Sequence, residues 1–244
     1  MFSASILILP LAAARLALAQ QYASTTTFEF SGSTLPTGLS ASNYKVGKIP
    51  NQHEYVPNNV DVSGGFLNLI VNGGQSTDSA ICGAEVVTDF TIASASVETY
   101  AILSEVPGVV NGKPSIQFNS IQTKSSQPTS LPTNPIAQGI FLYESDNQET
   151  DIEFLSSPVS QSNIDAGYTS SGALWYTNQA TTPGTPSTHK TSSAPSGAFS
   201  GVHNYRIDWN SSASTFYVDG EFKYQLTENV PTATNGSWLW NNWS

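Results

Sequence analysis

The sequence predicts an all-β fold in which short strands pack as a sandwich or a barrel. Only 11% of the 244 residues are charged, and the chain contains 18 Gly and 14 Pro. This composition is typical of a turn-rich β protein rather than a helix bundle. Short apolar or alternating runs recur between turn residues, and we find neither heptads nor a long helical period.

The expected strands follow one another at near-regular spacing, each bounded by turn residues. They span residues 25–30, 64–71, 85–92, 95–104, 140–145, 149–156, 172–179, 203–210, 215–226 and 237–243. Asp219-Gly220 lies between alternating aromatic residues, which predicts a tight hairpin within 215–226. Residues 146–148 are the expected turn between two further strands. Many short strands of this kind imply two packed sheets or a closed barrel.

Residues 113–138 do not fit this pattern. The segment is rich in Ser, Thr, Gln and Pro, has no period, and is longer than the loops of most compact domains. We expect a disordered surface excursion. Its ends can also be written with codons that resemble intron boundaries, so a retained intron is a second hypothesis.

The first 19 residues predict a signal peptide and therefore a secreted protein. An apolar run ends in the small-x-small sequence Ala17-Leu18-Ala19. A buried helix or a membrane anchor is the alternative, but a spanning helix needs about 20 apolar residues, and Pro10 and Arg15 interrupt this run. We expect the mature domain to comprise residues 20–244.

The balance of acidic and basic residues limits the kinds of molecule that the protein is expected to bind. The formal net charge is −10, which disfavours nucleic acid and anionic membrane surfaces but is compatible with a neutral polysaccharide. Cys82 is the only cysteine, so an internal disulfide is excluded. Asn210 and Asn235 lie in glycosylation sequons with turn-like surroundings, whereas we interpret the sequon at Asn242 as a chance match. We expect a monomer.

Three carboxylates alternate along QETDIEFLS. In a strand, Glu149, Asp151 and Glu153 share one face, while residues 150, 152 and 154 share the other and suit a core. Three like charges on one face repel one another, so a purely structural strand should not favour them. A solvated strand face and calcium ligation are the alternatives.

Glycoside hydrolysis is a reaction that needs such carboxylates. A retaining enzyme places two carboxyl groups about 5–5.5 Å apart across the sugar bond. The backbones of Glu149 and Glu153 would lie about 13 Å apart, a gap that two long side chains and a curved strand can largely close. Asp151 between them can separate the two pKa values, so that one Glu stays ionised and the other keeps its proton.

The order QETDIEFLS, ALWYTNQ, HNYRIDWNSSASTFYVDGEF and WLWNNWS resembles glycoside hydrolase family 16, as do SGGFLNLIV and the segment 83–110. The similarity covers most of the chain apart from 113–138. It implies a β-jelly-roll sandwich whose concave sheet binds the substrate. The chain also stops where family members continue into another strand, so we expect the chain as given to have reduced stability.

The resemblance also implies roles for individual residues. Glu149 becomes the nucleophile, Asp151 the assisting carboxylate and Glu153 the acid/base. The substrate-binding candidates are Tyr176, Asn178, Asn241 and Trp243, with Trp175 and Trp209 as weaker candidates. The three histidines show no metal-ligand spacing, and His189 is placed in a loop. No cofactor is required, and a structural calcium ion stays an open alternative.

Three functions fit this sequence. The first is a secreted retaining endo-β-glucanase acting on β-1,3 or mixed β-1,3/1,4 glucan, with β-glucan as its only partner. The second is a cell-wall glucan transglycosylase of the same family. The third is a non-catalytic lectin on the same fold, which is disfavoured because binding alone does not require all three carboxylates.

Overall fold

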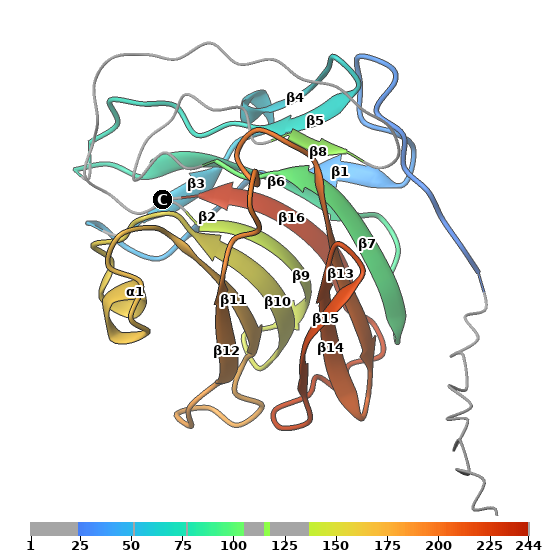
Figure 1. Cartoon of the computed structure of the whole chain (residues 1–244). Coiled ribbons are helices and arrows are strands. Elements are labelled where there is room, and N and C mark those ends of the chain that lie inside the picture. Colours follow the sequence, from blue (N-terminus) through green and yellow to red (C-terminus); the bar gives the residue numbers. More distant parts are fainter. Residues whose placement is uncertain (1–23, 51, 77, 105–114, 118–136, 244) are drawn as a thin grey trace, which may run out of the picture.

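A computed structural model confirms the predicted fold class, because it is a sandwich of two packed β-sheets (Figure 1). It describes residues 24–50, 52–76, 78–104, 115–117 and 137–243. The predicted signal peptide and most of segment 113–138 lie outside this part of the chain. Within the described residues, no helix is long and apolar enough to cross a membrane.

The larger sheet contains nine strands. In spatial order they are β12 (Thr188–Ser193), β11 (Ala173–Asn178), β10 (Gln148–Leu155), β9 (Ala137–Ser145), β16 (Ser237–Trp243), β6 (Ile81–Thr88), β3 (His53–Tyr55) and β2 (Tyr44–Val46), with β1 (Leu39–Ala41) also paired to β6. All pairs are antiparallel except β3 with β6, which is parallel. Strand β16 lies inside the sheet, with hydrogen-bonded neighbours on both sides.

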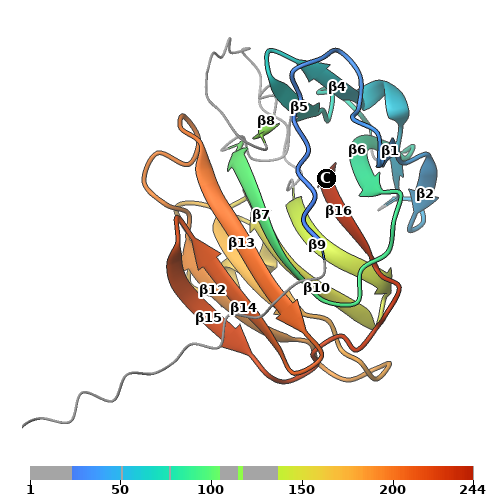
Figure 2. The ribbon, with the colours of Figure 1, turned by 90° about the vertical axis from the view of Figure 1, so that its right-hand side faces the viewer.

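The second sheet contains seven strands and faces the viewer in Figure 2. Their order is β15 (Glu221–Leu226), β14 (Ala213–Val218), β13 (His203–Asn210), β7 (Ala95–Ile102), β8 (Ser115–Gln117), β5 (Phe66–Leu69) and β4 (Val60–Ser63). A 3-10 turn, η1 (Pro57–Asn59), precedes β4, and the short helix α1 (Gln161–Asp165) follows β10.

The core lies between the two sheets and is rich in aromatic side chains. Ile152 and Phe154 of β10 point into it, as the alternation in β10 predicts. Trp209 and Trp240 are fully buried, and both satisfy the indole N–H: Trp209 donates to the carbonyl of Pro231 and Trp240 to Thr99 Oγ1, each at 3.0 Å.

Both predicted hairpins are confirmed. Asp219 and Gly220 have φ values of 53° and 76°, the left-handed pair that a two-residue turn between twisted strands requires. The other hairpin joins β9 to β10 and carries a bulge between Gln148 and Glu149. A bulge bends a strand locally, and this one lies at the first residue of the carboxylate series.

Three expectations were wrong. Residues 25–30 form no strand, although Phe28 and Phe30 are buried in the core. The expected loop around His189 contains strand β12. Segment 113–138 is not a surface excursion throughout, because Ser115–Gln117 pairs with both β7 and β5, and residues 137–138 begin β9. Open backbone positions on β7 and β5 explain the pairing of the short β8.

Candidate active site

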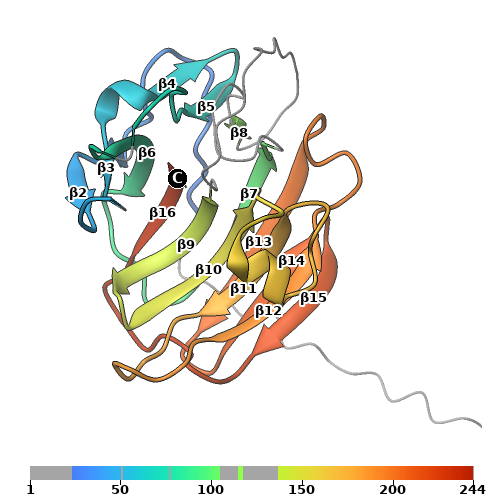
Figure 3. The same cartoon turned by 90° about the vertical axis from the view of Figure 1, so that its left-hand side faces the viewer.

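The three carboxylates lie on the face of the nine-stranded sheet that looks away from the core. We call this the carboxylate face. Their strand, β10, lies between β9 and β11 (Figure 3). Because Ile152 and Phe154 point into the sandwich, the alternation turns Glu149, Asp151 and Glu153 outward.

The three side chains differ in how far water reaches them. Asp151 is completely buried although it lies on the outer face, whereas Glu149 and Glu153 are partly exposed. Thr177 lies directly opposite Asp151 on β11. Neither carboxylate oxygen of Asp151 completes a hydrogen bond of ordinary geometry within the structure. The central carboxyl is therefore held in a poorly solvated position between two reachable ones.

Burial raises all three pKa values, and the charges of neighbouring carboxylates raise those of Glu149 and Asp151 further. Loss of hydration raises the pKa of Glu149 to about 8, with further increases from the charges of Glu153, Asp146 and Glu85. Burial raises the pKa of Glu153 to about 7. Burial, followed by the charges of Glu153 and Glu149, raises the pKa of Asp151 as well, and Thr177 and Gln179 partly offset this rise. The cluster consequently carries both protonated and ionised carboxyl groups near neutral pH.

Polar side chains cover the β16 and β6 side of the carboxylate face. We call Ser42, Tyr44, Tyr55, Glu85 and Asn241 the polar cluster. Glu85 Oε1 accepts hydrogen bonds from Ser42 Oγ at 2.7 Å and from Tyr44 Oη at 2.8 Å. Asn241 Nδ2 donates to Tyr55 Oη at 2.9 Å and reaches Glu85 Oε2 at 3.4 Å.

The polar cluster has a fixed arrangement of donors and acceptors. Burial and the neighbouring Glu85 raise the pKa of both Tyr44 and Tyr55, so both phenols keep their protons. Burial also raises the pKa of Glu85 itself, while its hydrogen bonds act in the opposite direction. These groups can hold sugar hydroxyls through directional hydrogen bonds.

Gly139 separates the polar cluster from the carboxylates. It pairs with Asn241 on one side and with Glu153 on the other. A Cβ atom at Gly139 would lie 2.6 Å from Asn241 Oδ1 and 3.1 Å from the Phe141 ring. Asn241 Oδ1 is buried and has no hydrogen-bond partner. The missing side chain therefore leaves the amide oxygen of Asn241 facing the gap beside Glu153.

Aromatic side chains lie on the opposite, β11 and β12 side of the carboxylates. Trp175 is directly opposite Glu153 in the β10–β11 pair and is partly exposed. Its ring centroid lies 5.1 Å from that of His189, which is exposed on β12. The Trp175 indole N–H donates to Asn163 Oδ1 at 2.9 Å.

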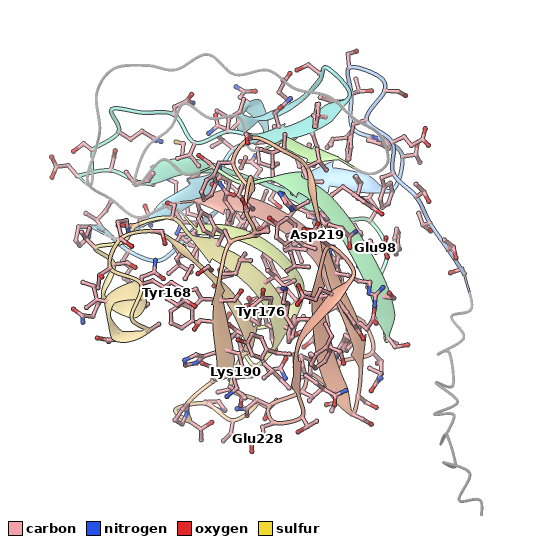
Figure 4. The ribbon with its side chains drawn as sticks, in the orientation of Figure 1. Glu98, Tyr168, Tyr176, Lys190, Asp219 and Glu228 are labelled. Atoms are coloured by element: carbon pink, nitrogen blue, oxygen red, sulfur yellow. The ribbon has the colours of Figure 1, made fainter. Side chains whose placement is uncertain are left out.

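Three predicted sugar contacts are wrong, because their side chains point into the protein. Tyr176 lies between the sheets, with ring centroids 5.4 Å from Phe216 and 5.3 Å from Tyr224 (Figure 4). Asn178 is fully buried on the same side of β11 and donates to the Glu228 carbonyl at 2.9 Å. Trp209 belongs to the core. The register of β11 against β10 turns Trp175 and Thr177 outward instead.

The other predicted contacts lie on the carboxylate face. Asn241 and Trp243 alternate with the buried Trp240 and Asn242 along β16, so both point outward. Trp243 is partly exposed and stacks on His53, with a centroid distance of 4.9 Å and an interplanar angle of 24°. Their contact with sugar stays a prediction.

Several residues of this face were missed in the sequence. They are Ser42, Tyr44, Tyr55, Glu85, Thr177 and Gln179. Glu85 had a readable indication, since it is a lone carboxylate in an otherwise apolar run. The tyrosines belong to short strands near the N-terminus, and no local pattern connects them with residues 149–153.

The structure also bears on the predicted modification and metal sites. Asn235 is exposed, and Asn210 is partly exposed at the end of β13, where its Oδ1 accepts hydrogen bonds from the backbone of Ser212 and Ala213. Asn242 is buried and donates to the Leu69 carbonyl, which fits its interpretation as a chance sequon. Among the described residues, no group of three or more His, Cys, Asp or Glu side chains is arranged to hold a metal ion.

A β-sandwich that carries one buried and two partly exposed carboxyl groups on an outer sheet face, flanked by polar and aromatic side chains, fits a carbohydrate-active protein. Residues 107–237 match the model of the glycosyl hydrolases family 16. The chain belongs to this family and is a glycoside hydrolase acting on O-glycosyl bonds. Comparison with curated protein sequences gives no match.

Solved structures share this fold. The chain is similar to the Bacillus licheniformis β-glucanase, with 19% identity, coverage of 91% of this chain and 86% of that one, and a TM-score of 0.62. It is also similar to the catalytic domain of an endo-1,3-β-glucanase (laminarinase) from Thermotoga petrophila, at 14% identity, 90% and 85% coverage and a TM-score of 0.62. A prokaryotic β-1,3-1,4-glucanase (lichenase) from a mouse hindgut metagenome matches at 18% identity, 90% and 86% coverage and a TM-score of 0.60.

Proposed function

We propose that the chain is a secreted, retaining endo-β-glucanase that cleaves β-1,3 or mixed β-1,3/1,4 glucan. The observation that carries the proposal is the carboxylate series on one strand, with Asp151 buried between two partly exposed Glu side chains. The glucanase names of the similar structures support the substrate class. A neutral glucan also suits a chain with a net charge of −10.

In this proposal the reaction runs in two displacements. The ionised Glu149 attacks the anomeric carbon, the bond to the leaving sugar breaks, and the proton of Glu153 passes to the leaving oxygen. In the second displacement the oxygen of a water molecule attacks the same carbon while Glu153 removes a proton from that water. The bond between Glu149 and the sugar then breaks. The raised pKa of Glu153 suits its first role as an acid. The pKa of Glu149 is raised further, to about 8, so Glu149 has to give up its proton before it attacks.

Asp151 keeps the two Glu side chains in different protonation states. A buried carboxyl with a raised pKa holds a proton readily, and it can donate a hydrogen bond to whichever neighbour is ionised. During the first displacement that neighbour is Glu149. Such a bond stabilises the nucleophile in its ionised form and orients it. The proposed role needs no metal ion and no cofactor.

The polar cluster suits the glucose residues that stay attached to the enzyme. Asn241 Oδ1 and Glu85 Oε2 offer acceptor atoms, and Tyr55, whose Oη accepts from Asn241, keeps its own proton to donate. We place Trp243, at the end of the same side, as a stacking surface for the next sugar. The predicted signal peptide and the sequons at Asn210 and Asn235 support secretion.

The test is incubation with defined glucans: β-1,3, mixed β-1,3/1,4, β-1,4 and β-1,6. We expect new reducing ends from the first two and none from the others. Glu149→Gln should reduce turnover by at least about a thousandfold, since it removes the nucleophile, while glucan binding is retained. Glu144→Gln, the same change at an exposed position of β9, is the matched control and should keep full activity.

Two outcomes would contradict the proposal. Equal turnover by wild type and Glu149→Gln would remove the mechanism. Binding of β-glucan without turnover by the wild type would instead favour a lectin.

A further inference from the structure

The side chains of the carboxylate face differ in chemical character on the two sides of β10. The polar cluster lies on the β16 and β6 side, where Glu85 and Asn241 are linked by hydrogen bonds to Ser42, Tyr44 and Tyr55. On the β11 and β12 side, Trp175 and His189 present rings instead. The division separates directional hydrogen bonding from stacking.

Trp175 is held more rigidly than a partly exposed side chain normally would be. Its indole N–H is bound by Asn163, which is completely buried in α1. The same Asn163 amide donates to the carbonyls of Leu155 and Ser157, each at 2.9 Å. Since Leu155 is the last residue of β10, the Trp175 ring is tied to the strand that carries Glu153.

His189 extends the aromatic surface toward the sheet edge. Thr177 pairs with His189, so Trp175 and His189 are diagonal neighbours on one face of the β11–β12 pair. Long and aromatic side chains touch across this diagonal. The two rings, 5.1 Å apart and tilted by 43°, form a continuous surface that starts opposite Glu153.

The two sides suit the two halves of a substrate in a retaining reaction. The sugar on the attacked side stays bound through both displacements, so directional hydrogen bonds that fix its orientation favour it. The leaving sugar must depart before an acceptor enters, and stacking binds sugar rings without requiring one orientation. Proximity to the acid/base also fits, because Glu153 must touch the leaving oxygen.

We propose that Trp175, extended by His189, is the platform for the leaving sugar and for the incoming sugar acceptor. This inference rests on the proposed function. The step at issue is the second displacement, in which Glu153 takes a proton from an acceptor hydroxyl whose oxygen attacks the anomeric carbon while Glu149 leaves. A sugar stacked on Trp175 competes with water for that position. The platform therefore sets the ratio of glucan transfer to hydrolysis.

The experiment compares two substrates with the same β-glucan trisaccharide on the attacked side. One carries fluoride as its leaving group, which has no ring to stack on Trp175, and the other carries glucose. We expect Trp175→Ala to lower kcat/KM about tenfold on the glucose-bearing substrate, equivalent to about 1.4 kcal/mol, and less than twofold on the fluoride substrate. With a glucan oligosaccharide added as acceptor, the ratio of transfer to hydrolysis should fall by a similar factor.

Two variants separate this role from a general loss of structure. Trp175→Phe keeps an aromatic face and should restore most of the transfer ratio. Trp243→Ala removes the same type of side chain on the other side of β10. It should lower kcat/KM to the same extent for both substrates. Equal loss on both substrates for Trp175→Ala, or an unchanged transfer ratio, would overturn the inference.

Failure of this inference is distinguishable from failure of the proposed function. Cleavage of the trisaccharide fluoride by the wild type tests the proposed function alone. The role of Trp175 is tested only by the difference in its effect on kcat/KM between the two substrates.

Discussion

At the scale of single residues, the main feature is that three carboxyl groups, one buried and two partly exposed, lie close together at a cost in folding free energy. The pKa of Glu149 rises from an ordinary 4.5 to about 8. Between these values the folded protein binds more protons than the unfolded chain, so the free energy of unfolding falls as the pH rises. The strand is therefore arranged for reactivity at the expense of stability.

Glu149→Gln should accordingly stabilise the protein while it abolishes turnover. The gain should be absent near pH 4, where Glu149 is protonated in both states, and should grow to roughly 2 kcal/mol at pH 8. Thermal or urea unfolding at several pH values measures it. Glu144→Gln should show no such pH-dependent gain, and a Glu149→Gln gain that is flat with pH would contradict the account.

At Gly139, the addition of a single Cβ atom should affect both stability and activity. Gly139→Ala places a Cβ atom 2.6 Å from Asn241 Oδ1, in the gap between the polar cluster and Glu153. We expect a loss of stability of roughly 1–3 kcal/mol from overpacking and a loss of activity of tenfold or more. Gly201→Ala is the control, because its Cβ atom would have its nearest neighbour at 3.6 Å, and it should change neither stability nor activity. A fully active Gly139→Ala would show that the substrate does not use the gap.

At the scale of elements, the sequence predicted strands well where one face is apolar. Strand β13 (His203–Asn210) begins and ends where the pattern predicts, and Asp219-Gly220 forms the expected hairpin turn. Strand β12 was missed because THKTSS carries no apolar face. Its backbone pairs with β11, and that contact is made by the tertiary fold rather than by local propensity.

Helix α1 was also missed, and its length explains why. Five residues, capped by Ser160, hardly produce a periodic pattern, and isolated helices of this size are unstable in water. The hydrogen bonds of Asn163 to β10 and to Trp175 hold it in place instead.

Asn163→Ala should therefore affect more than the helix. It leaves the carbonyls of Leu155 and Ser157 and the Trp175 indole N–H without their partner, which should cost roughly 2–4 kcal/mol of stability. The release of Trp175 should also lower the ratio of transfer to hydrolysis. Chemical denaturation and product analysis measure the two effects. Gln161→Ala, an exposed position of the same helix, should leave both unchanged; an equal effect of the two changes would mean that only helix formation matters.

At the scale of the whole molecule, the sequence was sufficient to predict the class of fold and the carboxylate strand. It was sufficient to predict only some of the other residues of the site. The alternation in β10 is local, so the common face of the three carboxylates follows from five consecutive residues. The register of β11 against β10 is not local. The resemblance suggested Tyr176 and Asn178 as sugar contacts, yet the pairing of Trp175 with Glu153 turns both toward the core.

Long-range pairing also assembled the polar cluster. Tyr44 and Tyr55 lie more than ninety residues before the carboxylates, and they reach the site because β3 pairs in parallel with β6, next to β16. The core between the sheets then fixes both faces. Such contacts have no signature in a single stretch of sequence.

In the proposed reaction, Glu149 forms a covalent bond with the substrate during turnover. We would detect this bond by mass spectrometry of the protein after reaction with a 2-fluoro β-glucan oligosaccharide that carries a good leaving group. Fluorine slows both displacements, and the good leaving group restores the rate of the first, so the covalent intermediate accumulates. We expect one oligosaccharide attached to the peptide that contains Glu149, and products that retain the β configuration. Attachment to Glu153, or products of inverted configuration, would contradict it.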